Sequence, residues 1–241
     1  MKITICNTEK EFFQQAAWRI AMTIVTCPDA LIGLSTGRTT GGIHNALVKL
    51  YADHPFDTSH ITVFGVDEIT NISPDYFGCC YYMLLHEVIK PLGIPLKNYV
   101  MPPTYSSDFK KECLHFEETL KLRGPVRLQV LGIGENGHLG FNQPGTPFGS
   151  TTWVSKMDKE LDERIHRETN SPPDKVLGGL TLGIKNIMQS EKILLVANGA
   201  RKARIIREAL YGPITEAIPA SILQLHPNCE VLVDDSAGSS I

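Results

Sequence analysis

Short apolar runs alternate with amphipathic stretches along most of the chain. Apolar runs predict buried strands at residues 30–34, 61–66, 126–133 and 192–197, of which the run at 126–133 is broken by Arg127 and Gln129. Weaker patterns predict strands at 2–6, 98–101, 151–154 and 230–233. Amphipathic spacing predicts helices at residues 8–26, 76–88, 107–122 and 157–168, and two more that end near 50 and 211. Strands and helices that alternate in this way form mostly parallel sheets with helices on both faces. The pattern therefore predicts a single three-layer α/β/α domain over residues 1–241, with a mostly parallel, Rossmann-like sheet.

Composition excludes several classes of protein. The chain has 241 residues, of which 42% are hydrophobic and 20% charged, and its net charge is −3. This is the profile of a globular protein without a basic surface for nucleic acid. The apolar run at the start is too short for a signal peptide, and no run reaches membrane-spanning length. We therefore expect a cytoplasmic protein with neither a membrane nor a nucleic acid as partner.

The six cysteines show no metal-binding pattern. None of them forms a CxxC pair, and nothing in the sequence indicates secretion, so a disulfide framework or a zinc site is not expected. We expect reduced, mostly packed thiols, no metal and no cofactor.

The segment at residues 131–144, LGIGENGHLGFNQP, carries the first candidate chemistry. A buried strand stops in a loop rich in glycine, at Gly132, Gly134 and Gly137, and that loop carries His138. Ligands of α/β sheets bind at the carboxyl ends of the strands, so the histidine is placed where chemistry takes place. A tight turn with a polar cap is the alternative, and this pattern alone does not decide between them.

A second loop suits a phosphate group. The strand at residues 30–34 is followed by a loop that opens a helix and contains Ser35, Thr36, Gly37, Arg38 and Thr39. Unpaired backbone N–H groups and the positive end of the helix dipole bind anions at such a place. An ordinary N-cap remains the alternative, because the loop matches neither common phosphate-loop pattern.

Two further strand ends carry charged residues. Asp67 and Glu68 follow the strand at residues 61–66 and are candidates for acid–base catalysis, or for capping a turn or helix. Lys202 lies at the start of the helix after residue 198. A lysine there opposes the helix dipole, which favours a position facing an anion such as phosphate.

Four stretches together resemble the glucosamine-6-phosphate deaminase and isomerase family. They are GLSTGRTT at residues 33–40, FGVDE at 64–68, GIGENGHLGFNQP at 132–144 and PASILQLHP at 219–227. They span most of the chain in the family's order. The NGHLG variant is closer to the galactosamine-6-phosphate branch, so the gluco or galacto configuration of the substrate stays open.

The resemblance implies roles for particular residues. Thr36, Gly37, Arg38 and Thr39, with Ser35 adjacent, match the phosphate loop, and Lys202 matches the phosphate lysine. Asp67 matches the carboxylate that moves a proton between C2 and C1, and His138 matches the acid–base group that opens the sugar ring. A further phosphate-binding arginine is implied, for which Arg164 and Arg167 are candidates.

Two catalytic positions depart from the family pattern. Asn136 and Gln143 stand where the glucosamine enzymes have aspartate and glutamate beside the histidine. An amide can hold the imidazole ring but contributes no charge, so the departure bears on ring opening and leaves the C2 step at Asp67 intact.

Three functions are weighed against these residues. The first is an amino-sugar 6-phosphate deaminase and isomerase, and the second is a 6-phosphogluconolactonase, a family with a similar fold and central loop. The FNQP segment at residues 141–144 and the DE pair argue against the lactonase. The third is a non-catalytic sugar-phosphate sensor, which only Asn136 and Gln143 favour. Each function implies a small-molecule sugar phosphate as partner, and a homo-oligomer is possible in each case.

Overall fold

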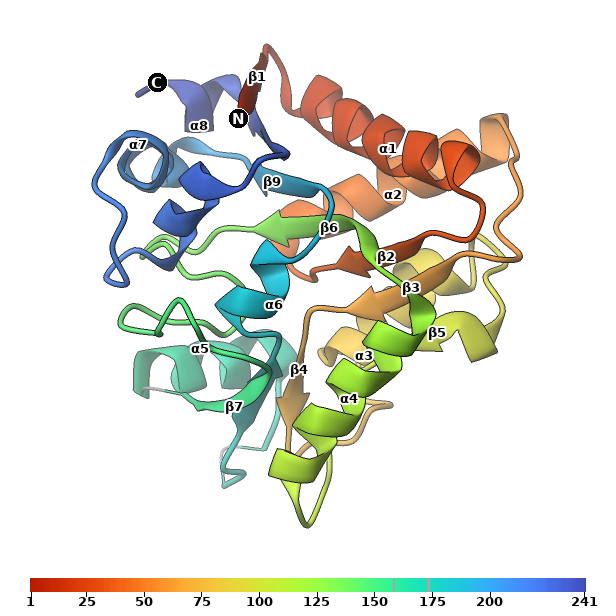
Figure 1. Cartoon of the computed structure of the whole chain (residues 1–241), viewed down its shortest axis with the longest axis vertical. Helices are drawn as coiled ribbons and strands as arrows, with labels where there is room; N and C mark the ends of the chain where they lie inside the picture. Colours follow the sequence, from red (N-terminus) through yellow and green to blue (C-terminus); the bar gives the residue numbers. More distant parts are fainter. Residues whose placement is uncertain (158, 173) are drawn as a thin grey trace.

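Seven parallel strands form the sheet around which the chain is built (Figure 1). The computed structural model describes residues 1–157, 159–172 and 174–241. The strand order is β1-β10-β9-β6-β2-β3-β5, and every recorded pair of neighbours runs parallel. The strands are β1 (Lys2–Cys6), β2 (Leu31–Leu34), β3 (Thr62–Gly65), β5 (Tyr99–Val100), β6 (Val126–Gly132), β9 (Ile193–Ala197) and β10 (Cys229–Asp234).

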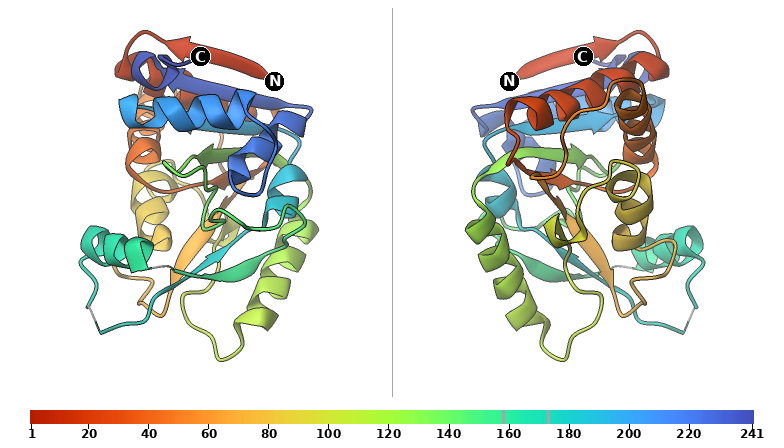
Figure 2. Two further views of the ribbon diagram at one scale, coloured as in Figure 1. Left: turned by 90° about the vertical axis from the view of Figure 1, so that its left-hand side faces the viewer. Right: turned by 90° about the vertical axis from the view of Figure 1, so that its right-hand side faces the viewer.

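Helices cover both faces of this sheet, as Figures 1 and 2 show. One face packs against α1 (Glu9–Thr26), α2 (Arg38–Asp53), α3 (Cys80–Leu84) and the π-helix η1 (Leu85–Ile89). The other packs against α4 (Phe109–Arg123), α6 (Ile184–Met188), α7 (Ala203–Tyr211), the 3₁₀ helix η4 (Pro219–Leu225) and α8 (Asp235–Gly238). Two short 3₁₀ helices, η2 (Leu96–Asn98) and η3 (Ala200–Lys202), complete the connections. The predicted α/β fold with a mostly parallel sheet is confirmed.

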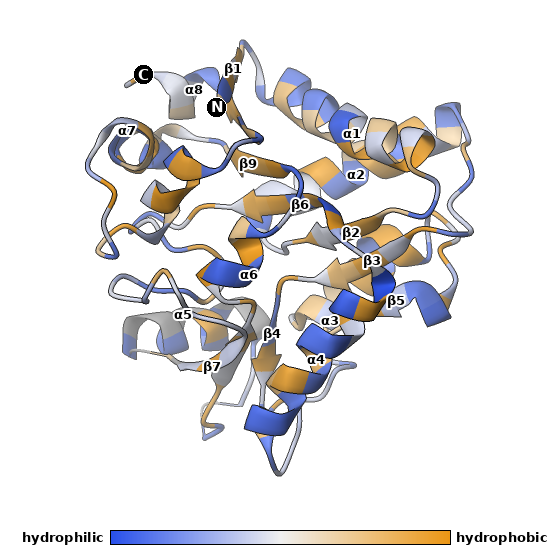
Figure 3. Cartoon of the chain, viewed as in Figure 1, coloured by the Kyte–Doolittle hydropathy of each residue, from blue (hydrophilic) through white to orange (hydrophobic). Residues whose placement is uncertain are grey.

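The strands are apolar on both sides because both faces of the sheet are buried. In β6, Leu128 and Val130 belong to the cluster with α1 and α2, whereas Leu131 belongs to the cluster with α4 and α7. Figure 3 shows the central strands as mostly hydrophobic ribbons, while α4 alternates between hydrophobic and hydrophilic residues. Continuous apolar runs and amphipathic helices are the patterns that a doubly covered parallel sheet requires.

A second, antiparallel sheet lies beside the first and was not predicted. It consists of β4 (Asp67–Thr70), β8 (Gly178–Thr181) and β7 (Trp153–Lys156), in the order β4-β8-β7. The chain passes between the sheets at Val66, whose N–H donates to Leu34 O at 3.1 Å and whose carbonyl accepts from Leu182 N at 2.9 Å. Asp67 therefore begins a new strand, and does not end one as the sequence suggested, because its hydrogen-bond partners come from a distant part of the chain.

Local capping sets several helix boundaries. Thr8 Oγ1 accepts from Glu11 N at 3.1 Å, so α1 begins where the sequence predicted. The helix predicted from residue 76 begins only at Cys80, because residues 73–79 form turns and the carboxylate of Glu68 caps the first turn of α3. The charged helix α5 (Lys159–Thr169) packs through Ile165 on a small cluster that also contains Ile69 and Phe141.

Candidate active site

The predicted site residues follow strands that are neighbours in the parallel sheet. β9, β6, β2 and β3 are adjacent in that order. The segments that follow them carry Lys202, His138, the loop of residues 35–39 and Asp67. Because parallel strands end at the same edge, the fold gathers these four segments at the carboxyl edge of the sheet.

Close backbone packing fixes the loop that carries His138. Gly134 N donates to His138 O at 3.0 Å, and a Cβ on Gly134 would lie 2.1 Å from His138 Nδ1. Gly137 has φ +86° and packs against Ile218, and its carbonyl accepts from Ala220 N at 2.9 Å. Gly134 thus leaves room for the imidazole ring. The motif at residues 219–227, which contains η4, therefore supports the histidine loop through Ala220.

Asn136 and Gln143 form a chain of hydrogen bonds that ends on the imidazole. Asn136 Oδ1 accepts from His138 N at 3.2 Å and lies 2.7 Å from His138 Nδ1, and Asn136 Nδ2 donates to Gln143 Oε1 at 3.1 Å. The backbone N–H requires an oxygen at that place, so Nδ1 of the ring must carry a hydrogen. In the neutral imidazole the lone pair is then on Nε2. A histidine in this tautomer can act as a base through Nε2.

Asp67 lies between this loop and α3. The ideal Cβ position on Gly140 is 3.2 Å from Asp67 Oδ2 and 2.6 Å from Thr181 Oγ1, so the histidine loop passes directly over the carboxylate. On the other side, Cys80 Sγ lies 3.7 Å from Asp67 Oδ1. Burial raises the pKa of Asp67 from 3.8 to about 6, and the hydrogen bond from Cys80 acts in the opposite direction. A carboxylate with this pKa can accept a proton near neutral pH.

Glu68 has a different role from its neighbour. It is fully buried, and its carboxylate accepts three backbone hydrogen bonds, from Ile69 N at 2.8 Å, Cys80 N at 2.9 Å and Tyr81 N at 2.7 Å. Burial raises its pKa to about 7, against the effect of these hydrogen bonds. Of the two interpretations of the DE pair, capping applies to Glu68, whereas Asp67 has a place in the site.

The phosphate-loop candidate presents backbone N–H groups. Gly37 has φ +133°, and the first hydrogen bond of α2 runs from Gly41 N to Gly37 O at 2.8 Å. The N–H groups of the first turn, at residues 38–40, therefore have no partner within the helix and point out from the positive end of its dipole. Arg38 is exposed beside them. This arrangement suits an anion.

The hydroxyl groups of this loop donate to protein atoms. Ser35 Oγ donates to Val130 O at 3.0 Å, Thr36 Oγ1 to Cys80 Sγ at 3.1 Å and Thr39 Oγ1 to Asn198 Oδ1 at 2.6 Å. Neither Asn198 nor Cys80 was predicted from the sequence to contribute to the site. Asn198 was recognisable as the first polar residue after β9, but Cys80 carried no signal.

Lys202 is joined to the central loop. It ends η3, directly before α7, and its Nζ donates to Ile133 O at 2.7 Å, at the start of the histidine loop. The contact between Thr39 and Asn198 links the start of α2 to the segment after β9, which leads to Lys202. Arg167 is exposed on α5, and no described contact joins it to these loops. The side chain of Arg164 lies outside the described residues.

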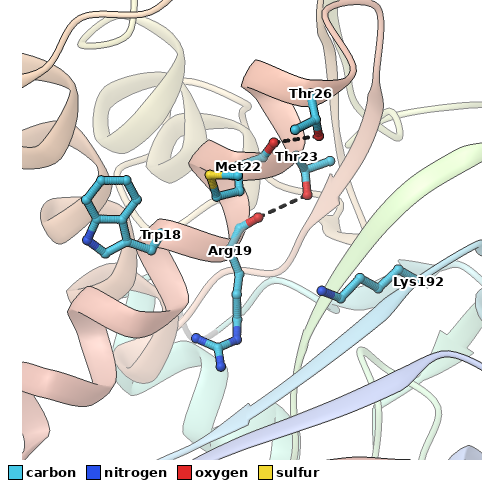
Figure 4. Close-up of a pocket in the computed structure, with 6 residues that line it drawn as sticks. All are labelled: Trp18, Arg19, Met22, Thr23, Thr26 and Lys192. Carbon is cyan, nitrogen blue, oxygen red and sulfur yellow. Dashed lines mark hydrogen bonds between the residues drawn. The ribbon is translucent and has the colours of Figure 1, made fainter.

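A groove elsewhere on the surface has no comparable chemistry (Figure 4). Its volume is about 390 Å³, and Trp18, Met22 and Lys192 are among the residues that line it. Lys192 precedes β9, so the groove lies at the amino end of that strand. Its two cations are paired with Glu230, at 2.8 Å from Arg19 and 3.1 Å from Lys192.

The described residues contain neither a metal-binding cluster nor a membrane-spanning helix. Residues 1–157, 159–172 and 174–241 contain no group of three or more histidine, cysteine, aspartate or glutamate side chains placed to hold a metal ion. In the same part of the chain, no helix has the length and apolar character needed to cross a membrane.

Comparison with known proteins places the chain in a family. Residues 7–232 match the family described as glucosamine-6-phosphate isomerases/6-phosphogluconolactonase. The chain is 36% identical over 241 residues to the glucosamine-6-phosphate deaminase of Clostridium acetobutylicum, with 100% of both chains covered. It is 34% identical over 235 residues to that of Lachnoclostridium phytofermentans, covering 96% of this chain and 98% of the relative.

Solved structures agree with this result. A protein described as a monomeric glucosamine-6-phosphate deaminase superposes with a TM-score of 0.95 at 34% identity, with 100% of both chains covered. The 6-phosphogluconolactonase of Trypanosoma brucei superposes with a TM-score of 0.80 at 18% identity, covering 100% of this chain and 98% of the other, which shows a shared fold. The chain therefore belongs to the glucosamine-6-phosphate isomerase/6-phosphogluconolactonase family.

Proposed function

We propose that this protein is an amino-sugar 6-phosphate deaminase, which converts a 2-amino-2-deoxyhexose 6-phosphate to the ketose 6-phosphate and ammonia. The observation that carries the proposal is the position of Asp67. Its carboxylate, with a pKa of about 6, lies directly beneath the loop that carries His138. A base and an acid–base group on facing segments suit a sugar that must first open and then lose a proton at C2. Relatives named glucosamine-6-phosphate deaminase support the same reaction.

Ring opening requires a group that transfers a proton between two oxygens of the sugar. We assign this role to His138, because the hydrogen bond to Asn136 holds the tautomer whose Nε2 carries the lone pair. Nε2 takes the proton of the C1 hydroxyl and delivers it to the ring oxygen as the C1–O5 bond breaks. Asn136 and Gln143 orient the imidazole ring of His138 through their hydrogen bonds.

The C2 step requires a base that is ionised near neutral pH and is held at a fixed place. We assign it to Asp67, whose carboxylate removes the C2 proton and returns it to C1, while one proton of the amino group passes to the C1 oxygen. The C2–N bond is then an imine, and water adds to it and releases ammonia. The overall reaction consumes one water, which makes the enzyme a hydrolase as well as an isomerase in its chemistry.

Phosphate binding is assigned to the start of α2 and to Lys202. The N–H groups at residues 38–40, the Arg38 guanidinium and the Lys202 ammonium can all donate to phosphate oxygens. The hydroxyl groups of Thr36 and Thr39 donate to Cys80 and Asn198, so they support the loop and can donate to a phosphate only after turning.

The alternatives have less support. The Trypanosoma brucei lactonase is 18% identical to this chain, against 34% for the monomeric deaminase. The sensor hypothesis rests on Asn136 and Gln143, and the structure gives both amides a place in the hydrogen-bond chain to the imidazole.

Substrate configuration, location and assembly are further proposals. We propose glucosamine 6-phosphate as substrate on the strength of the named relatives, with galactosamine 6-phosphate as the competing substrate. A charged sugar phosphate does not cross a lipid bilayer unaided, so we place the protein in the cytoplasm with its substrate. One similar solved protein is described as monomeric, and a homo-oligomer is the alternative assembly.

Ammonia release tests the proposal directly. The purified protein should release ammonia from one of the two amino-sugar phosphates and should re-form that compound from the matching ketose 6-phosphate and ammonium. Hydrolysis of 6-phosphogluconolactone without ammonia release would favour the lactonase. Binding of the sugar phosphates without turnover would favour the sensor.

A further inference from the structure

The thiol of Cys80 lies between the phosphate loop and the proposed base. Cys80 is the first residue of α3, and it is buried, with 5% of its surface exposed. Thr36 Oγ1 donates to Cys80 Sγ at 3.1 Å, and the thiol in turn lies 3.7 Å from Asp67 Oδ1, within reach of a weak S–H···O hydrogen bond. Because the sulfur accepts from Thr36, its own hydrogen is directed toward the carboxylate.

The start of α3 is held in place by the residue next to Asp67. The Glu68 carboxylate accepts from Cys80 N and Tyr81 N, and Tyr99 Oη donates to Tyr81 O at 2.8 Å. The strand β4 therefore fixes both ends of the contact, since it carries Asp67 and, through the side chain of Glu68, also anchors the backbone of Cys80.

The two oxygens of Asp67 face different parts of the site. Oδ1 faces the Cys80 thiol, whereas Oδ2 faces Gly140 in the histidine loop. Burial raises the pKa of Cys80 well above its usual value, so the thiol keeps its proton and acts as a donor. A thiol that keeps its proton can donate a hydrogen bond to the carboxylate, whereas it is a poor nucleophile.

We propose that Cys80 is a positioning residue that holds Asp67 Oδ1 with a thiol proton oriented by Thr36, leaving Oδ2 to accept the C2 proton. The inference rests on the proposed role of Asp67 as the base. A thiol that donates to the ionised carboxylate also stabilises its charged form, so its removal must change the titration of Asp67.

The test compares Cys80 with its neighbour. Cys79 is also buried, but its thiol donates to Ser73 O at 3.1 Å and not to Asp67, which makes Cys79→Ala the matched control. The titration of Asp67 is followed by NMR of ¹³C-labelled aspartate carboxyl groups in the ligand-free protein. Cys80→Ala should raise the Asp67 pKa by about half a unit or more, whereas Cys79→Ala should leave it unchanged.

Two additional variants keep the test decisive. Cys80→Ser retains a donor and should shift the titration less than Cys80→Ala. Cys80→Val, which is close to cysteine in size, serves in place of the alanine variant if that variant does not fold. In the active enzyme, the acid limb of the pH profile of kcat/KM should move by the same amount as the NMR titration.

The outcomes separate this inference from the proposed function. An Asp67 titration that is the same in Cys80→Ala and in Cys79→Ala overturns the role of Cys80, whatever the turnover of the two proteins. Absence of ammonia release from the unaltered protein overturns the proposed function, and the NMR titration still decides whether the thiol holds the carboxylate.

Discussion

Replacement of Asp67 by asparagine should abolish the C2 step and stabilise the protein at the same time. Asparagine cannot accept the C2 proton, so exchange of that proton with solvent should stop while phosphate binding is nearly unchanged. Stability should rise because the pKa of Asp67 is raised by burial, which means that the folded protein disfavours the charged carboxylate at neutral pH.

The size of the stability gain follows from the pKa. A rise from 3.8 to about 6 corresponds to about 3 kcal/mol at about 1.36 kcal/mol per unit. Asp67 is partly exposed, and water screens part of this cost, so we expect a gain of about 1–3 kcal/mol in the free energy of unfolding. For a chain of this size, the melting temperature should rise by about 2–12 °C.

The pH dependence distinguishes this cause from others. An acid whose pKa is raised in the folded state does not lower the free energy of unfolding below pH 3.8, where it is protonated in both states. As the pH rises from 3.8 to about 6, only the unfolded state ionises freely, so the free energy of unfolding falls. The melting temperatures of Asp67→Asn and the unaltered protein should therefore show their full difference at about pH 8 and little difference at about pH 4. Asp75→Asn, which changes an exposed carboxylate in the following loop, is the control. A gain that is equal at both pH values, or a loss at pH 8, would refute the reasoning.

Three more predictions concern the same site. Lys202→Ala should raise the dissociation constant for a sugar 6-phosphate about ten- to a hundredfold, since a charged hydrogen bond contributes about 1.5–3 kcal/mol. Lys202→Arg keeps the charge and serves as the control. An unchanged affinity in the alanine variant would show that the phosphate binds elsewhere. The acid limb of kcat/KM should lie near pH 6, because protonation of Asp67 removes the base, and a limb near pH 4 would contradict the burial of its carboxylate. Asn136→Asp with Gln143→Glu should raise turnover of the cyclic substrate if the amides limit ring opening. A double variant that is no faster than a parent turning over about 10 times per second would show that they do not.

The main elements of the fold could be predicted because their signals are local. The apolar runs at residues 30–34, 126–133 and 192–197 become β2, β6 and β9, and Thr8 caps α1 as expected. The second sheet could not be predicted, because β4 pairs with β8, more than a hundred residues further along the chain. A strand of four residues has too little pattern of its own to show which partner it will find.

The sequence by itself determined which residues follow the strands of the parallel sheet, and therefore that Asp67, His138, Lys202 and the loop at residues 35–39 gather at its carboxyl edge. Only the tertiary structure decided the hydrogen-bond partners and the pKa values of these groups. Contacts between segments that are distant in the chain give Asp67 and Glu68 different roles and place the thiol of Cys80 on the carboxylate of Asp67. Such contacts also bury Asp67, which raises its pKa. Burial and hydrogen-bond partners are properties of the packed protein, so a local pattern carries no signal for them.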